Sequence, residues 1–190
     1  MLQKVIKNQG NLLIVEIVQP TFLHYLQVTI ASTLGVLFLC PLIRPFEVLS
    51  PGEMKNGEKN IMTDIGSIQP VTWLHQGTVG DPNYLYLVSY IDYAEGTFHQ
   101  DSTEMIKELM DVSIETQVKT LSGDLVYQSE APFGMYPGVI FRASYNKNSA
   151  VVKGRIILIR NRLYILQVYT LSEKSLNPEM DKFLDSFKTK

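Results

Sequence analysis

The chain has 190 residues, of which 45% are hydrophobic and 19% are charged, a balance typical of a globular protein rather than a disordered one. Its formal net charge is −2 and no basic face stands out, which argues against a nucleic-acid-binding protein. The single cysteine, Cys40, excludes an intrachain disulfide and a metal site built from several cysteines.

The first 45 residues contain an apolar segment, residues 22–43, without a single Lys, Arg, Asp or Glu. A helix that spans a bilayer needs about 20 apolar residues, and the apolar core of a signal peptide needs about 7–15. The whole segment is long enough to span, whereas its most apolar part, residues 28–39, fits a signal core. We therefore expect residues 1–45 to be a signal or membrane-anchor segment with a hydrophobic helix.

Cys40 directly follows the apolar core, as the lipidated cysteine does in a bacterial lipoprotein signal. Such signals have small residues before the cysteine, where this chain has Phe38 and Leu39. Three fates are therefore open: lipidation at Cys40, an uncleaved transmembrane anchor, or simple cleavage. In a fourth alternative the segment is buried within the domain itself, but residues 1–20 add no globular pattern that would need it.

Residues 46–190 are predicted to form one globular domain, which begins with weak signals. Residues 46–49 alternate weakly before a Ser-Pro-Gly turn and predict a short edge strand. The charged residues 53–60 indicate a solvated loop. Residues 61–76 indicate two strands bent at Gly66, and Trp73, the only tryptophan, is expected in the core rather than in a ligand site.

The clearest alternating strand is predicted at residues 84–93. Tyr84, Tyr86 and Tyr90 share one face, and the opposite face carries Leu85 and other apolar residues. Because both faces are bulky, we expect a layer on each side of the sheet. The row of tyrosines is more typical of a core face than of a ligand groove.

A helix is predicted to start at Asp101, because Glu104 follows three residues later in a capping-box pattern. Its buried stripe has helical spacing and consists of Ile106, Leu109, Met110 and Ile114. The helix is expected to end between Thr116 and Ser122. Two strands, residues 125–130 and 139–145, follow with a shaped loop rich in Pro and Gly between them.

The chain is organised around residues 154–169, where two apolar runs flank the short polar break Arg160-Asn161-Arg162. Branched apolar residues favour strands, and a short connection containing Asn predicts a tight hairpin. The runs are continuous rather than alternating, so both faces should be covered, as in the middle of a sheet. Arg160 and Arg162 at the tip are candidate contacts for an anionic protein partner; the favoured alternative is that they only keep the turn solvated.

The last predicted element is a helix with Asn177 as cap and Pro178 in its first position. Its apolar stripe should pack on the sheet and consists of Met180, Phe183, Leu184 and Phe187. About seven strands with short connections and two helices predict an α+β domain, an antiparallel sheet covered by helices on its faces.

Several stretches of the domain resemble a family of uncharacterised bacterial proteins. The run from Gly154 to Leu166 resembles a GRxxLxxNRLYxL pattern, and residues 183–188 resemble FLxSFK. The YPG and SYxDY stretches at residues 136–138 and 89–93 belong to the same resemblance. More remotely, the domain is similar to the α/β/α sandwich of the PsbP proteins of photosystem II and the Mog-type Ran regulators. The resemblance implies a binding module, often exported and tethered, without a common catalytic residue; it carries over no metal or partner ligand.

No catalytic constellation or cofactor motif is found in the sequence. The three histidines, His24, His75 and His99, lack the spacing of metal ligands, and no phosphate-binding glycine loop or nucleophile elbow occurs. Asp92, Glu95 and Asp101 are close enough in sequence to be weighed as a cation site. We predict no catalytic, cofactor or metal residues and no cofactor.

The leading functional hypothesis is a non-catalytic, membrane-associated binding or accessory domain on the extracytoplasmic face of a bacterial cell. The membrane, through residues 1–45, and a protein are its expected partners, and nucleic acid is not. The alternative is a hydrolase or metal-dependent enzyme whose site is assembled from separate strands. A deep pocket with converging carboxylates and a histidine would favour the enzyme, and a shallow groove would favour the binding domain.

Overall fold

The computed structural model describes residues 44–190 apart from 59–60, 64–65, 69 and 100–101. The predicted N-terminal hydrophobic segment and Cys40 lie outside the described residues, and so does Asp101. Within the described part of the chain, no helix is long and apolar enough to cross a membrane.

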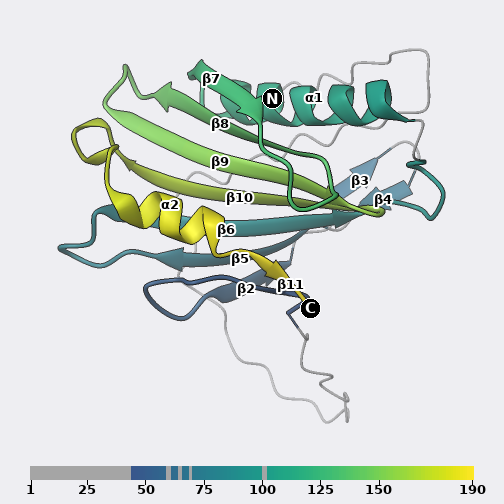
Figure 1. Ribbon diagram of the computed structural model, residues 1–190. Helices are drawn as coiled ribbons and strands as arrows, with labels where there is room; N and C mark the ends of the chain where they lie inside the picture. Colours follow the sequence, from purple (N-terminus) through teal and green to yellow (C-terminus); the bar gives the residue numbers. More distant parts are fainter. Residues whose placement is uncertain (1–43, 59–60, 64–65, 69, 100–101) are drawn as a thin grey trace, which may run out of the picture.

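The centre of the domain is an antiparallel sheet of seven strands in the order β2-β5-β6-β10-β9-β8-β7 (Figure 1). In chain order its strands are β2 (Lys55–Glu58), β5 (Val71–Gln76), β6 (Asn83–Asp92), β7 (Asp124–Glu130), β8 (Gly138–Tyr145), β9 (Ala150–Ile159) and β10 (Arg162–Leu171). Two small pairs accompany the sheet: β1 (Phe46–Glu47) with β11 (Lys188–Thr189), and β3 (Ile61–Thr63) with β4 (Gly66–Ile68). The predicted α+β class and the seven-stranded sheet are confirmed.

The predicted central hairpin is formed by β9 and β10, and β10 is the middle strand of the seven. Ile159 pairs with Arg162, so the turn consists of Arg160 and Asn161 alone. Arg160 has a left-handed backbone with φ of 55°. Gly154 in β9 is required by packing, because an added Cβ would lie 2.3 Å from the Phe141 ring. The missing side chain thus lets an aromatic ring lie across the neighbouring strand.

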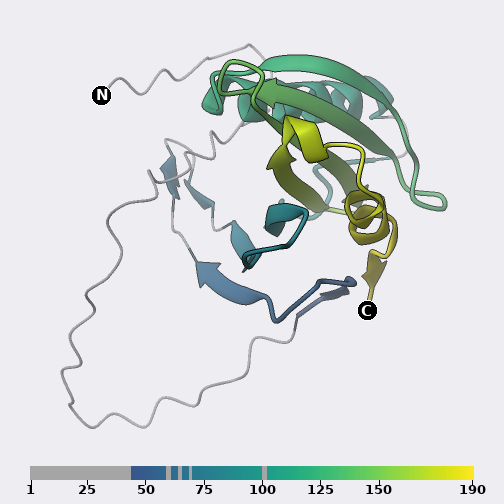
Figure 2. The same cartoon turned by 90° about the vertical axis from the view of Figure 1, so that its left-hand side faces the viewer.

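Each face of the sheet carries its own apolar core. Figures 1 and 2 show one helix over each face. Helix α1 (Thr103–Thr120) covers one face with Leu109, Met110 and Ile114. Helix α2 (Pro178–Asp185) covers the other face with Met180, Phe183 and Leu184. The face under α2 includes Tyr86, Val88, Tyr90, Ile157, Tyr164, Leu166 and Val168. Tyr86 and Tyr90 of the predicted tyrosine row therefore belong to a core, as expected. Tyr84 does not: it is 39% exposed, and its ring lies 6.3 Å from that of Tyr169, which belongs to the core of the other face.

Two predictions about the first third of the domain are wrong. Residues 53–60, predicted to be a loop, contain β2, where Asn56 pairs with Trp73 of β5. An edge strand needs pairing on one side only and tolerates charged residues, so its sequence lacks the alternation of an inner strand. Residues 61–76 contain three strands rather than two, because the bend at Gly66 separates β3 from β4 ahead of β5.

Helix α2 begins where the sequence predicts, with Asn177 in an extended conformation and Pro178 in the first turn. The Asn177 side chain, however, makes no capping hydrogen bond. Its amide instead pairs with the buried amide of Asn83 at the start of β6, with N–O distances of 2.9 and 3.1 Å. A cap is recognised from local sequence, whereas this contact joins residues 94 positions apart.

Candidate functional site

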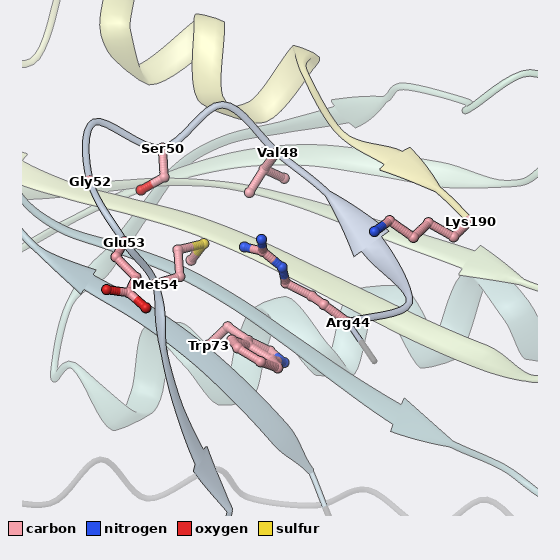
Figure 3. A pocket seen from close by; sticks show the side chains of 8 residues that line it. All are labelled: Arg44, Val48, Ser50, Gly52, Glu53, Met54, Trp73 and Lys190. Carbon is pink, nitrogen blue, oxygen red and sulfur yellow. The ribbon is translucent and has the colours of Figure 1, made fainter. Parts of the chain in front are cut away.

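A cavity of about 500 Å³ lies beside the edge of the sheet that β2 and β5 form (Figure 3). It is closed by the segment that enters the domain, by β5 and by the end of the chain. Its lining consists of Arg44, Val48, Ser50, Gly52, Glu53, Met54, Trp73 and Lys190. The pocket therefore joins the first described residues to the last ones, which no local sequence pattern could predict.

Trp73 and Arg44 form one wall of this pocket. The guanidinium carbon of Arg44 lies 5.5 Å from the Trp73 ring centroid and 5.8 Å from that of Phe46. Cations over an indole ring are attracted by its negative face. Phe46, fully buried, meets the Trp73 ring edge to face at 6.3 Å and anchors it to the core under α2. Trp73 is thus a core residue on one side, as expected, and a pocket wall on the other.

Two residues of the lining carry buried polar atoms without a hydrogen-bond partner among the described residues. These atoms are the indole nitrogen Nε1 of Trp73 and the hydroxyl oxygen of Ser50. A buried donor or acceptor left unsatisfied costs about 1–3 kcal/mol, so folded proteins rarely keep one without a reason.

The loop over the pocket is held in place by His75. With its proton on Nδ1, the His75 ring donates to the carbonyl oxygen of Glu53, with 3.1 Å between nitrogen and oxygen. A Cβ at Gly52 would lie 2.4 Å from the same ring, so only glycine allows the loop to approach this closely. His75 thus positions two residues of the lining, Gly52 and Glu53, but is not itself part of the lining.

The charges around the pocket are mixed, with cations in excess. Lys190 forms an exposed ion pair with Glu47 at 3.4 Å, and Glu53 is the one carboxylate among the described lining residues. Arg44 makes ring contacts but has no ion pair within the described part of the chain. The arrangement can hold an anion against the Arg44 guanidinium. Among the described residues, no group of three or more His, Cys, Asp or Glu is placed to hold a metal ion.

The second candidate site, the hairpin tip, contains two arginines in different settings. Arg162 binds Asp92 with two hydrogen bonds, from Nε to Oδ1 at 2.5 Å and from Nη2 to Oδ2 at 2.7 Å. Its guanidinium carbon also lies 4.5 Å from the Tyr90 ring centroid. The hydrogen bonds to Asp92 raise the pKa of Arg162 further above its usual value. The interpretation that both arginines merely solvate the turn is therefore wrong for Arg162.

Arg160 is exposed and, among the described residues, has no ion pair with a carboxylate. It is therefore the more accessible of the two arginines, and its contact with an anionic partner stays a prediction. The weighed cation site is not assembled in the described part of the chain, because Asp92 is engaged by Arg162 and Asp101 lies outside that part.

Sequence reasoning missed Arg44 and Ser50 as pocket residues. In the sequence, Arg44 directly follows the apolar segment and Ser50 belongs to a Ser-Pro-Gly turn, and neither position has a pattern typical of a binding site. Their meeting with Trp73 depends on the pairing of β1 with β11 and on the register of β5. The only feature of the sequence that could have indicated the pocket is Trp73, the single tryptophan of the chain, in a predicted strand.

Comparisons with known proteins show a remote likeness of fold. No protein-family model matches the chain, and no curated protein matches it. Among solved structures, the chain is similar to the solution structure of the cyanobacterial PsbP protein (CyanoP) from Synechocystis sp. PCC 6803. The identity is 9% and the TM-score 0.39, over 70% of this chain and 92% of that chain. No residue role is transferred from it.

Proposed function

We propose that the protein is a non-catalytic binding domain, held at the extracytoplasmic face of a membrane by residues 1–45, which takes an anionic ligand in the pocket beside Trp73. The observation that carries this proposal is the guanidinium of Arg44, stacked on Trp73 without an ion-pair partner among the described residues. A carboxylate or phosphate group would supply the missing charge.

The membrane part of the proposal rests on the sequence and on one juxtaposition. Residues 22–43 carry no charge, and Arg44 follows them directly. Arg44 is also the first described residue and lines the pocket. A membrane segment that ends at residue 43 would therefore keep the pocket close to the bilayer surface. An accessory domain that binds a ligand next to the membrane fits this arrangement.

The alternative, a hydrolase or metal-dependent enzyme, needs an acid–base pair or a nucleophile beside the bound substrate. The described lining of the pocket contains one carboxylate, Glu53, one hydroxyl, Ser50, and no histidine. The lining is thus better suited to holding an anion than to transferring a proton. No observation favours the enzyme over the binding domain.

The only tryptophan of the chain reports directly on the pocket. We would titrate the detergent-solubilised full chain with succinate and with inorganic phosphate at constant ionic strength and follow Trp73 fluorescence. A saturable change is expected with one of the two anions. Arg44→Gln should weaken it about 10- to 100-fold, because a hydrogen bond to a charged group contributes about 1.5–3 kcal/mol.

The matched control is Lys147→Gln. It removes an exposed positive charge from the turn between β8 and β9, which does not line the pocket. This variant should bind as the unchanged chain does. A response that is linear with both anions, or an affinity that is the same with and without the Arg44 guanidinium, would rule out the anion pocket.

A further inference from the structure

Strand β7 is an open edge of the sheet. It is last in the strand order and pairs only with β8, so within the described residues no strand occupies its outer side. Figure 1 shows β7 along one margin of the sheet, at the end opposite β2. All seven of its residues are exposed, and three consecutive apolar ones, Leu125, Val126 and Tyr127, are 40–56% exposed. An edge of this kind offers backbone N–H and C=O groups at alternate residues to an incoming strand.

The protection that usually blocks such an edge is weak in β7. Natural edge strands often carry lysine or proline or are very short, whereas β7 has seven residues without Lys, Arg or Pro. A register shift between Leu125 and Tyr127 disturbs only its first part. From Tyr127 to Glu130 the pairing with β8 is regular. The last four residues therefore form a straight template for another strand.

The charges of this edge are acidic. Asp124 and Glu130 stand at the two ends of β7, which contains no cation. Asp111 of α1 accepts a hydrogen bond from Gln128 of the same strand at 3.0 Å, which adds a third carboxylate. Lys107 is the neighbouring cation and is paired with Asp111 at 2.6 Å. Lys107 also attracts Glu130. Three carboxylates thus face one cation, and this acidic balance favours a positively charged occupant.

A second copy of this chain is a poor occupant. Antiparallel pairing of two β7 strands centred on Tyr127 would place Asp124 of each copy opposite Glu130 of the other. Like charges directly opposite each other on neighbouring strands are destabilising. A foreign segment with Lys or Arg at these two positions would convert the same two contacts into ion pairs.

We propose that β7 is a docking edge for an extended segment of a partner protein, which adds as a strand and carries basic residues on either side of a short β-branched stretch. In this mode the main-chain hydrogen bonds provide affinity, and the flanking charges provide specificity. Leu125 and Tyr127 would then be covered by the partner. This surface is separate from the anion pocket, which lies at the β2 and β5 side of the sheet.

The test is a selection of random ten-residue peptides displayed on phage, with the full chain in detergent micelles as the target. We expect enriched peptides with Lys or Arg on both sides of Val, Ile or Thr. An enriched peptide should slow amide exchange at residues 127–130. Glu130→Lys should weaken its binding at least tenfold at low salt.

Glu173→Lys makes the same charge change at an exposed position outside the sheet and should leave the affinity unchanged. The proposal is overturned if no peptide is enriched, if enriched peptides lack basic residues, or if they bind the Glu130→Lys variant as well as the unchanged chain. A concentration-dependent dimer whose formation slows amide exchange at residues 127–130 would show that a second copy, rather than a foreign segment, occupies the edge.

Discussion

Truncating Phe183 tests whether α2 holds one face of the domain together. Phe183 is 1% exposed and its ring meets that of Tyr86 at 5.2 Å between centroids. Helix α2 has only eight residues, and isolated helices shorter than about 12–15 residues are marginal in water. Its stability must therefore come from packing against the sheet. Phe183→Ala removes the largest side chain that α2 inserts into the core.

The expected cost is about 3–5 kcal/mol, the usual range for a buried Phe replaced by Ala. This is a large part of a domain's total stability of about 5–15 kcal/mol. For a chain of this size each 1 kcal/mol lowers the melting temperature by about 2–4 °C, so a fall of about 6–20 °C is expected. Chemical denaturation of the full chain in detergent, followed by Trp73 fluorescence, measures the same loss.

The control is Lys182→Ala, next to Phe183 on the outer face of α2. Lys182 makes only an exposed contact with Glu179 at 3.6 Å. Its removal should change the free energy of unfolding by less than about 0.5 kcal/mol. If the two variants were equally mild, α2 would not be docked through Phe183, and the assignment of this face as a core would fail.

Three further predictions concern the hairpin tip, the anchor and the response to alkali. Arg162→Ser should destabilise the domain by about 1 kcal/mol, since it removes the paired hydrogen bonds to Asp92, whereas Arg160→Ser should cost less than about 0.5 kcal/mol in the same denaturation assay. A reporter fused after the last residue should be active only outside the cytoplasm, and activity confined to the cytoplasm would contradict this. If Cys40 is lipidated, Cys40→Ser should lose a lipid mass shift; an unchanged mass would point to an uncleaved anchor or to simple cleavage. Burial raises the pKa of Tyr93 to about 12, so the folded chain retains a proton that the unfolded chain loses near pH 10, and stability should fall as the pH rises from 10 to 12. A Tyr93→Phe variant should show less of this fall.

The sequence patterns predicted what is local in the fold. Continuous apolar runs around a two-residue turn identified the central hairpin, because branched residues and a tight connection specify it without distant partners. The stripe of Met180, Phe183 and Leu184 likewise identified the buried face of α2. The strand β2 was missed, because its pairing with β5 supplies the stability that its own charged residues do not indicate.

The candidate sites were less predictable, because they depend on contacts between distant residues. Arg162 meets Asp92 across 70 positions, through the register of β10 with β6. The pocket joins Arg44 to Trp73 and to Lys190 through two separate pairings, of β1 with β11 and of β2 with β5. Side-chain type alone cannot separate an arginine that solvates a turn from one that holds two strands, since both positions are polar and near a loop.

Asn177 can stabilise the domain in two ways: locally, as the cap of α2, or through its hydrogen bonds with the distant Asn83. Asn83 is fully buried; its amide nitrogen donates to the Tyr86 hydroxyl at 2.8 Å, and its oxygen accepts from Asn177 at 2.9 Å. Asp and Asn are about equally good at a helix N-cap, so Asn177→Asp would be nearly neutral if capping were its role. Aspartate cannot donate to the Asn83 oxygen, however, and would leave it buried without its partner. We therefore expect Asn177→Asp to cost about 1–3 kcal/mol in chemical denaturation, as much as Asn177→Ala. A neutral Asn177→Asp beside a costly Asn177→Ala would return Asn177 to the role of a simple cap.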